Sequence, residues 1–414
     1  MKSYNYILPT LVLALCPVLD IYLVQGLPIY WFAVALSLPF CLGALNIRTL
    51  GKRKTEIQWF FLILVLSFIG FLINTNESWF SDTLFFHNLV SISVSFLALI
   101  ILTIKVDYKL FLRAIITIGL IASVICIYQR ISLIITGDFY RNFYLPGLEV
   151  SQYEFVEIMS RPMAIFREPA HLCIYLLPIL YLMLLKRNYL FGSIVGLGVL
   201  SSGSTTGFIM LFVILLWHFI DTKAGFLYIM ALVVITVLFA FGIITFYPEI
   251  ILENIDKLNE TESDNIRLFG GVEYIEKMDG IQKIVGIGLN QCDNFLRVKG
   301  MFVGYNGNYA NSLLFSIISY GYIGFLFFVI YLCKLWKKYK LNRGFEIILI
   351  SILASDQILF NAHLVYLLTF VLLIDQSRIS RISMTKPGLT KVSQVMAHLI
   401  ILHKIGIKKA SKFV

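Results

Sequence analysis

Charged residues are scarce in this sequence of 414 residues: they make up only 14% of it, whereas hydrophobic residues make up 59%. A soluble protein usually has about a quarter charged residues, so this chain could not cover a water-exposed surface of ordinary polarity. Cysteine is also sparse, and its six positions show neither metal-site spacing nor a disulfide framework. These shortages exclude a soluble enzyme, a nucleic-acid-binding protein and a disulfide-rich secreted domain.

Long apolar segments, by contrast, fill most of the sequence. About twelve of them approach the length of roughly 20 residues that a helix needs to cross a hydrocarbon layer. We therefore predict an all-α protein, a polytopic bundle of transmembrane helices over residues 1–376. A basic tail follows over residues 377–414, and we expect it to be cytoplasmic.

The basic residues fall in alternate predicted loops. They cluster at residues 48–54, 105–113, 186–187 and 334–343, and again in the tail. Lysine and arginine are enriched in loops on the cytoplasmic side of a membrane. The pattern predicts a multi-pass protein with both termini in the cytoplasm.

Two long loops, at residues 130–170 and 247–308, lie on the opposite side of this predicted topology. Loops of this length are usually functional or disordered. The second has apolar residues at helical spacing over 250–258 and again over 272–282. We expect a small helical cap there.

Charged side chains cluster where the first long loop enters an apolar segment, in the sequence RPMAIFREPAH of residues 161–171. The ionisable residues of this segment are Arg161, Arg167, Glu168 and His171. Pro169 suits the first turn of a helix, which places Glu168 at the helix N-terminus. In one interpretation the charges only anchor the helix at the membrane interface. In the other, the arginines face an anion while Glu168 or His171 handles a proton.

Polar or small residues recur at other predicted helix ends. They are Ser204 and Thr205 in the turn 201–207, Arg267 in the second long loop, the G-x-G of residues 286–288, Asn308 and Asn311 before an apolar segment, and the G-x-x-G of residues 321–324. Each also has a packing or capping interpretation, because small residues let helices approach closely and asparagine caps helices.

In this order, the motifs resemble those of the Wzy-type O-antigen polymerases. These belong with the O-antigen ligases to a superfamily of multispan glycosyltransferases with a GT-C-like architecture. The resemblance rests on R-P-x-x-x-F-x-E-P at 161–169, the Ser/Thr turn, Arg267, the G-x-G, and N-S at 311–312 followed by G-x-x-G. It covers roughly residues 160–325 by motif and the whole chain by hydropathy.

The sequence also departs from this family. Ala310 stands where many relatives have histidine before the asparagine, and Thr205 stands where some have arginine. The ligases are thought to use a histidine in the large loop, yet no histidine occurs between His218 and His363. This favours a polymerase over a ligase.

The resemblance implies transfer of a glycan from a polyisoprenyl diphosphate to another lipid-linked repeat unit, at the periplasmic face of a bacterial inner membrane. The product would be O-antigen or capsule, with no metal or cofactor required, and a second protein could regulate chain length. Arginine suits the diphosphate because its guanidinium binds phosphate oxygens bidentately. The expected catalytic residues are Glu168 first and His171 second. The expected substrate-binding residues are Arg161, Arg167, Arg267, Ser204, Thr205, Asn308 and Asn311.

Two acids inside apolar segments, Asp20 and Asp356, support an alternative function. Intramembrane acids often mark proton pathways, as in a proton-coupled flippase of lipid-linked oligosaccharides. Against a flippase, we find no internal repeat, and the polar sequence is concentrated on one side. A ligase-like glycan transferase is the other alternative.

Overall fold

The computed structural model describes residues 6–43, 45–140, 143, 147–150, 161–222, 271–300 and 310–374. By their contacts, residues Met1–Leu373 group into one compact unit and Ile374–Val414 into a second. The described helices and strands all belong to the first unit. The predicted site residues Arg267 and Asn308, the apolar pattern at 250–258 and the basic tail lie outside the described residues.

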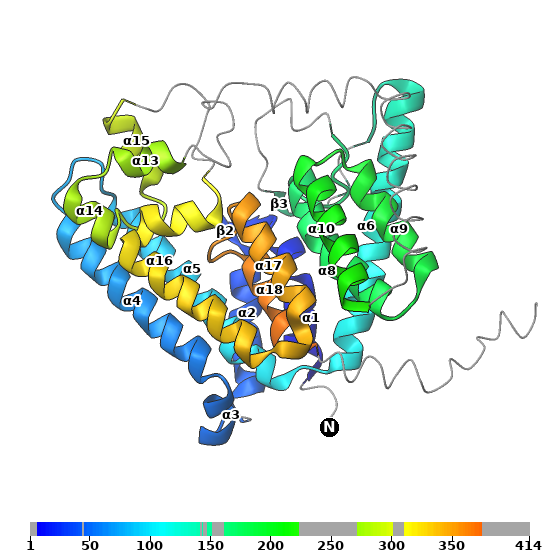
Figure 1. Ribbon diagram of the computed structural model, residues 1–414, viewed down its shortest axis with the longest axis horizontal. Coiled ribbons are helices and arrows are strands. Elements are labelled where there is room, and N and C mark those ends of the chain that lie inside the picture. The colour runs from blue at the N-terminus through cyan, green and yellow to red at the C-terminus, as the bar shows by residue number, and fades with distance from the viewer. Residues whose placement is uncertain are drawn as a thin grey trace, which may run out of the picture. The chain divides into compact units, whose positions relative to one another are not determined.

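The first part of the chain folds into helices and one small sheet (Figure 1). Its helices are α1 (Ile7–Leu19), α2 (Ile29–Leu42), α3 (Ile47–Lys52), α4 (Lys54–Asn74), α5 (Asp82–Ile100), η2 (Leu102–Lys105) and α6 (Tyr108–Thr136). The strands β1 (Tyr22–Val24), β2 (Leu27–Pro28) and β3 (Glu149–Val150) form an antiparallel sheet in the order β2-β1-β3.

The described remainder of the chain is helical. Its elements are α8 (Pro169–Leu185), α9 (Tyr189–Ser201), α10 (Thr205–Thr222), α13 (Gly271–Glu276), α14 (Gly280–Val285), α15 (Cys292–Val298), α16 (Ser312–Lys338), η4 (Lys340–Asn342), α17 (Arg343–Ser355) and α18 (Ala362–Leu373).

Four described segments are long and apolar enough to cross a membrane: α4, α5 with η2, α6 and α16. Several other apolar helices are shorter, and α17 and α18 have only 13 and 12 residues. At 1.5 Å per residue these two are about 20 and 18 Å long, less than the hydrocarbon thickness of about 30 Å. The helical class is thus confirmed and the apolar helices indicate a membrane protein, whereas the number of spans stays a prediction.

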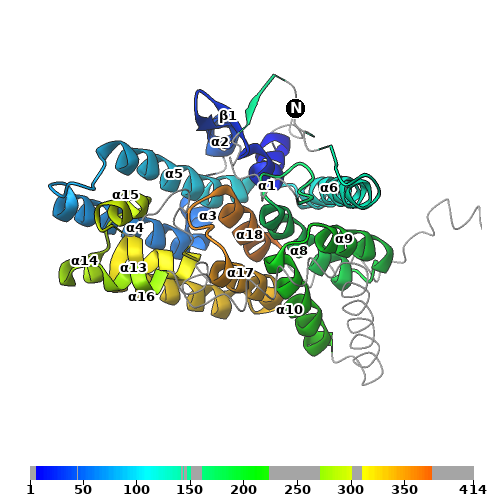
Figure 2. The same cartoon turned by 90° about the horizontal axis from the view of Figure 1, so that it is seen from above.

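Helices α1, α8 and α18 pack together, although they are far apart in the sequence (Figure 2). The rings of Tyr175 on α8 and Tyr366 on α18 stack with centroids 4.6 Å apart. The Tyr366 hydroxyl donates to the Tyr175 carbonyl at 3.0 Å, and the Tyr175 hydroxyl donates to the Ala14 carbonyl of α1 at 3.1 Å. These buried bonds fix the relative positions of the three helices.

The two glycine motifs form a single packing contact. Gly321 has φ 66° and interrupts α16, whose first turns bend away from the rest of the helix (Figure 1). A Cβ at Gly286 would lie 2.2 Å from the Ser319 carbonyl oxygen, and one at Gly321 would lie 2.1 Å from that of Ile284. Only glycine allows backbones this close, so both motifs have a structural role at this contact.

The second predicted cap helix is divided. The pattern over 272–282 predicts one helix, but the chain forms α13 and α14 with a break at Met278 and Asp279. The Asp279 amide donates to Oε1 of Gln282 at 3.0 Å and so starts a new helix. Ile281 is 62% exposed, whereas Gln282 is buried. The prediction of one continuous helix is wrong because this local capping interaction restarts it.

Candidate functional site

The charged segment enters α8 as its sequence predicts. Glu168 is the N-cap residue with extended backbone, Pro169 opens the helix, and His171 lies in its first turn. The preceding residues are held by the fully buried Gln129 of α6. Its side-chain oxygen accepts hydrogen bonds from the amides of Met163 and Ala164, at 3.2 and 2.8 Å. Gln129 therefore sets the path by which the segment reaches α8.

Ionisable side chains from three helix ends meet at the start of α8. The imidazole of His171 lies against that of His363, in the first turn of α18, with ring centroids 4.3 Å apart and planes tilted by 36°. Asp20, which follows the last residue of α1, is close enough to His171 and Arg167 for their charges to interact. His363 interacts with the same two cationic groups. We call Asp20, Arg167, His171 and His363 the histidine cluster.

Burial and charge both act on the histidine cluster. The charge of Arg167 favours the ionised form of Asp20, which is partly exposed. His363 is only 2% exposed, and neither of its ring nitrogens has a hydrogen-bond partner among the described residues. Other buried side chains of the described residues, among them Glu56 and Glu346, also lack hydrogen-bond partners, so His363 is distinguished by its contact with His171.

The connection between α17 and α18 positions His363. Two residues of this connection, Ile358 and Phe360, are buried. The Ser312 hydroxyl donates to the Asp356 carbonyl at 2.7 Å, and the side chain of Asn361 accepts from the His363 amide at 2.9 Å. Irregular backbone is tolerated at membrane depth only where protein or a water-filled cavity surrounds it. The sequence predicts Asp20 and Asp356 within apolar spans, whereas in the structure each lies at the end of a helix.

The serine turn lies beside the same part of α8. The Ser202 hydroxyl is 3.2 Å from the Cys173 thiol, two residues beyond His171, and the Ser204 hydroxyl accepts from the Gly207 amide at 3.3 Å. Arg130 of α6 donates to the Ser201 carbonyl at 2.8 Å. The turn therefore has a packing role against α6 and α8.

The remaining predicted site residues are placed as follows. Thr205 is the first residue of α10, and Arg161 is partly exposed at the start of the charged segment. Asn311 caps α16, because its side-chain oxygen accepts from the amides of Leu313 and Leu314, each at 3.1 Å. These two hydrogen bonds match the capping interpretation of Asn311, and its substrate-binding role stays a prediction.

Sequence reasoning missed two members of the cluster as partners of His171. Asp20 was noticed only as an acid in an apolar segment, and His363 only as a histidine near the end of another. Nothing in the sequence around Arg130 indicated its bond to the serine turn, because its neighbours in sequence form no motif.

No protein-family model matches the sequence, and no curated protein matches it significantly. Functional interpretation therefore rests on the chemistry of the residues and their arrangement.

This arrangement offers two kinds of chemistry. The guanidinium of Arg167 can bind an anion, and an imidazole such as that of His171 can accept or donate a proton. Among the described residues, no three histidine, cysteine or acidic side chains are grouped to hold a metal ion.

Proposed function

We propose that this protein polymerises oligosaccharide repeat units, carried on polyisoprenyl diphosphate, into a surface polysaccharide such as O-antigen or capsule. One observation carries the proposal: an arginine and a pair of contacting histidines meet where apolar helices end. A lipid-anchored substrate would reach such a site from the bilayer. Its diphosphate would require a cation, and the acceptor hydroxyl would require a base.

The leaving group explains the need for arginine. Transfer breaks the bond between the anomeric carbon and a phosphate oxygen, and negative charge develops on the departing diphosphate. Preplaced positive charge in a poorly hydrated site stabilises that charge strongly. In the proposed site Arg167 has this role, together with Arg161 and Arg267.

The proposal includes the rest of the predicted site. Ser204, Thr205, Asn308 and Asn311 would contact the sugars or the phosphate, and Glu168 would orient the acceptor hydroxyl. The extended backbone at Glu168 places it at the positive end of the α8 dipole, where negative charge is stabilised.

The proposed setting is a bacterial inner membrane. It has about twelve spans in a GT-C-like arrangement, both termini cytoplasmic, and loops 130–170 and 247–308 in the periplasm. Labelling of single cysteines with a membrane-impermeant maleimide in intact cells tests this topology. Labelling in 247–308 is expected, and protection of that loop until the cells are lysed would contradict it.

Gene deletion and complementation in the source organism test the activity, with surface polysaccharide separated on a gel. A polymerase mutant should lose the ladder and retain a single capped repeat. Polymer that accumulates on the lipid carrier without being attached would instead indicate a ligase. Absence of any periplasmic repeat would indicate a flippase.

Site variants test the role of the arginines in the same complementation. Arg161→Ala and Arg267→Ala should abolish the ladder at normal membrane expression, whereas exposed Arg113 on α6 gives a matched control in Arg113→Ala. Normal ladders from both variants would remove these two arginines from the site.

A further inference from the structure

We infer that His171 is the base that deprotonates the acceptor hydroxyl, that Asp20 stabilises its protonated form, and that His363 is a positioning residue that holds its ring. This inference rests on the proposed function and reverses the order in which the sequence ranks Glu168 and His171.

The two histidines differ in access. His171 is partly exposed, so its ring can contact a substrate, whereas His363 is enclosed by protein. The Cys16 thiol of α1 lies 3.4 Å from the Ala362 carbonyl, and Asn361 caps the helix at His363. The backbone at His363 is thus held from both sides, which fixes the surface against which the His171 ring lies.

Electrostatics limits the cluster to few protons. The two imidazoles have centroids 4.3 Å apart and lie beside Arg167. Repulsion between like charges therefore strongly disfavours the state in which both imidazoles are protonated. The carboxylate of Asp20 compensates one additional positive charge near His171. In this cluster a neutral His171 can gain one proton during the reaction, and the Asp20 carboxylate then stabilises the resulting imidazolium.

Other titratable groups lie on the elements packed against α18. They are Cys16 on α1, Asp82 and His87 on α5, Lys105 of η2, Glu168 before α8, Cys173, Tyr175 and Tyr181 on α8, Arg343 and Glu346 in the first turn of α17, and Asp356 after α17. Helix α5 also contributes Ser91 and Ser95, whose hydroxyls donate to the Phe360 carbonyl at 3.1 and 3.0 Å. Asp20 directly follows α1, whose Cys16 thiol donates to the Ala362 carbonyl at the start of α18, and this places its carboxylate near His171.

The step balances as follows. The acceptor O–H proton passes to a ring nitrogen of His171 while the acceptor oxygen forms a bond to the anomeric carbon of the donor. The bond from that carbon to the phosphate oxygen breaks, and its electron pair stays on the diphosphate, which Arg167 binds. The proton on His171 then leaves to water. A positioned base of this kind typically contributes about 10²–10⁴-fold in rate.

A pH–rate profile tests the inference. Membranes from the deletion strain that express each variant are supplied with the lipid extract of that strain, which contains the unpolymerised repeat units. His171→Gln should lower the rate by about 10²-fold or more at every pH. Asp20→Asn should shift the acidic limb of the profile by about one pH unit, whereas His363→Phe should leave the limb in place.

Both expectations follow from charge. In Asp20→Asn the loss of negative charge makes the protonated base less stable, so the acidic limb moves to lower pH. His363→Phe keeps a ring against His171 and removes an enclosed imidazole that carries no charge, so the limb should stay in place. His87→Phe is the matched control: His87 on α5 contacts the Trp31 ring at 4.9 Å outside the cluster, and its replacement should leave the profile unchanged.

The outcomes separate the two proposals. If wild-type membranes form no polymer, the proposed function and the base assignment both fail. If they form polymer but His171→Gln stays active, or the acidic limb of Asp20→Asn does not move, only the base assignment fails. Should His363→Phe not accumulate in the membrane, His363→Gln replaces it, and if that is also absent the direction of the Asp20→Asn shift decides.

Discussion

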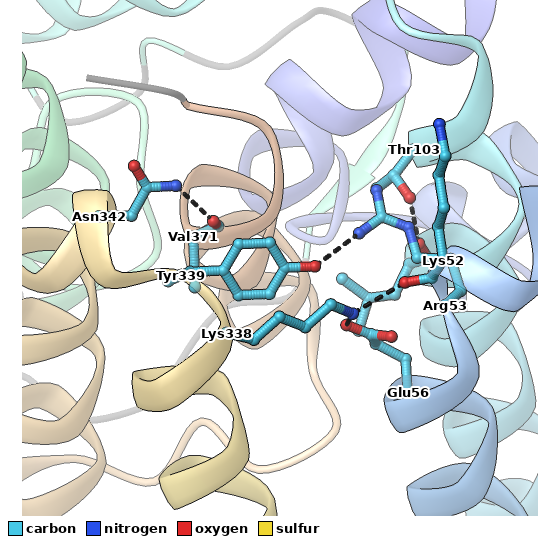
Figure 3. A network of polar contacts seen from close by, with 9 residues as sticks. Lys52, Arg53, Glu56, Thr103, Lys338, Tyr339, Asn342 and Val371 are labelled. Atoms are coloured by element: carbon cyan, nitrogen blue, oxygen red, sulfur yellow. Dashed lines mark hydrogen bonds and ion pairs between the residues drawn. The ribbon is translucent and has the colours of Figure 1, made fainter. Parts of the chain in front are cut away.

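Two regions with buried charged groups can be compared along α18: the histidine cluster at its first turn and a network at its last. In the network, shown in Figure 3, the Lys338 amine lies 3.5 Å from Oε1 of Glu56 and donates to the Lys52 carbonyl at 2.8 Å. Arg53 donates to the Tyr339 hydroxyl at 3.4 Å, and Asn342 donates to the carbonyl of Val371 on α18 at 2.7 Å. We call these residues the anchoring network.

The difference lies in where the polar atoms are directed. Lys338, Arg53 and Asn342 each bond to a neighbouring helix or helix end, which fastens α3, α4, α16 and α18 together. In the histidine cluster, the His363 nitrogens have no such partner within the described part of the chain. The anchoring network contains an ion pair and hydrogen bonds between helices, although the Glu56 carboxylate and the side-chain oxygen of Asn342 accept no hydrogen bond within the described residues. The two regions therefore differ in the bonds that join their helices, and both contain buried polar atoms without a hydrogen-bond partner.

The largest expected effect is on catalysis at the histidine cluster. Arg167→Ala removes a preplaced positive charge and should lower the polymerisation rate by about 10²–10³-fold. Purified protein and the lipid extract of the deletion strain allow this measurement. Arg167→Lys keeps the charge but loses bidentate geometry, so it should recover part of the rate. An Arg167→Ala protein with full activity would contradict a catalytic role for the histidine cluster.

A change in the anchoring network should affect stability instead. Lys338→Met leaves the carboxylate of Glu56, which is fully buried, without its ion pair. Unfolding free energy should fall by about 3 kcal/mol, the low end for a broken buried pair because Arg53 remains close to the region. Thermal unfolding in detergent measures this. The double variant Lys338→Met/Glu56→Gln should regain much of the loss, while the rate per folded molecule stays constant in both.

Gln129→Leu tests the support of the cluster. The substitution leaves the buried amides of Met163 and Ala164 without an acceptor, which costs about 1–3 kcal/mol. Because these amides precede Arg167, both stability and polymerisation should decrease. Ser132→Ala on the same helix removes an exposed bond to the Asp138 carbonyl and should change neither. Reduced stability with full activity would show that Gln129 does not position the segment.

The smallest effect is expected at a helix cap. Asn311→Ala removes the acceptor for the first amides of α16 and should lower stability by about 1 kcal/mol. Asn311→Asp keeps that acceptor and should have the stability of the wild type. If Asn311 also binds substrate, as the sequence predicts, Asn311→Asp would retain stability and lose activity, which separates the two roles in one assay.

The local features of the site could be predicted from sequence. Pro169 and the charges around it define the start of α8, because proline favours the first turn whatever surrounds it. The helical class follows equally directly from composition. The helix start at Asn311 was also anticipated, since a side-chain cap requires only neighbouring residues.

The long-range features could not be predicted. His171 and His363 are 192 positions apart, and their contact depends on how α8 and α18 pack, which no local pattern encodes. The contact of Gly286 and Gly321 was invisible for the same reason, although each glycine was noticed separately. Asp20 was misplaced because hydropathy extends a span past the point where the backbone stops being helical.

The brevity of α17 and α18 has a consequence for which molecules can react. Helix α18 starts at Ala362 and is about 18 Å long, which is shorter than a layer about 30 Å thick. In the proposed membrane setting, a first turn inside that layer would place His363 below the level that water-soluble sugars reach. A nucleotide sugar dissolved in the aqueous phase would have to shed its hydration to arrive there. A glycan tethered to a long isoprenoid is delivered to that depth by its own tail, so the membrane itself would act as the first selectivity filter.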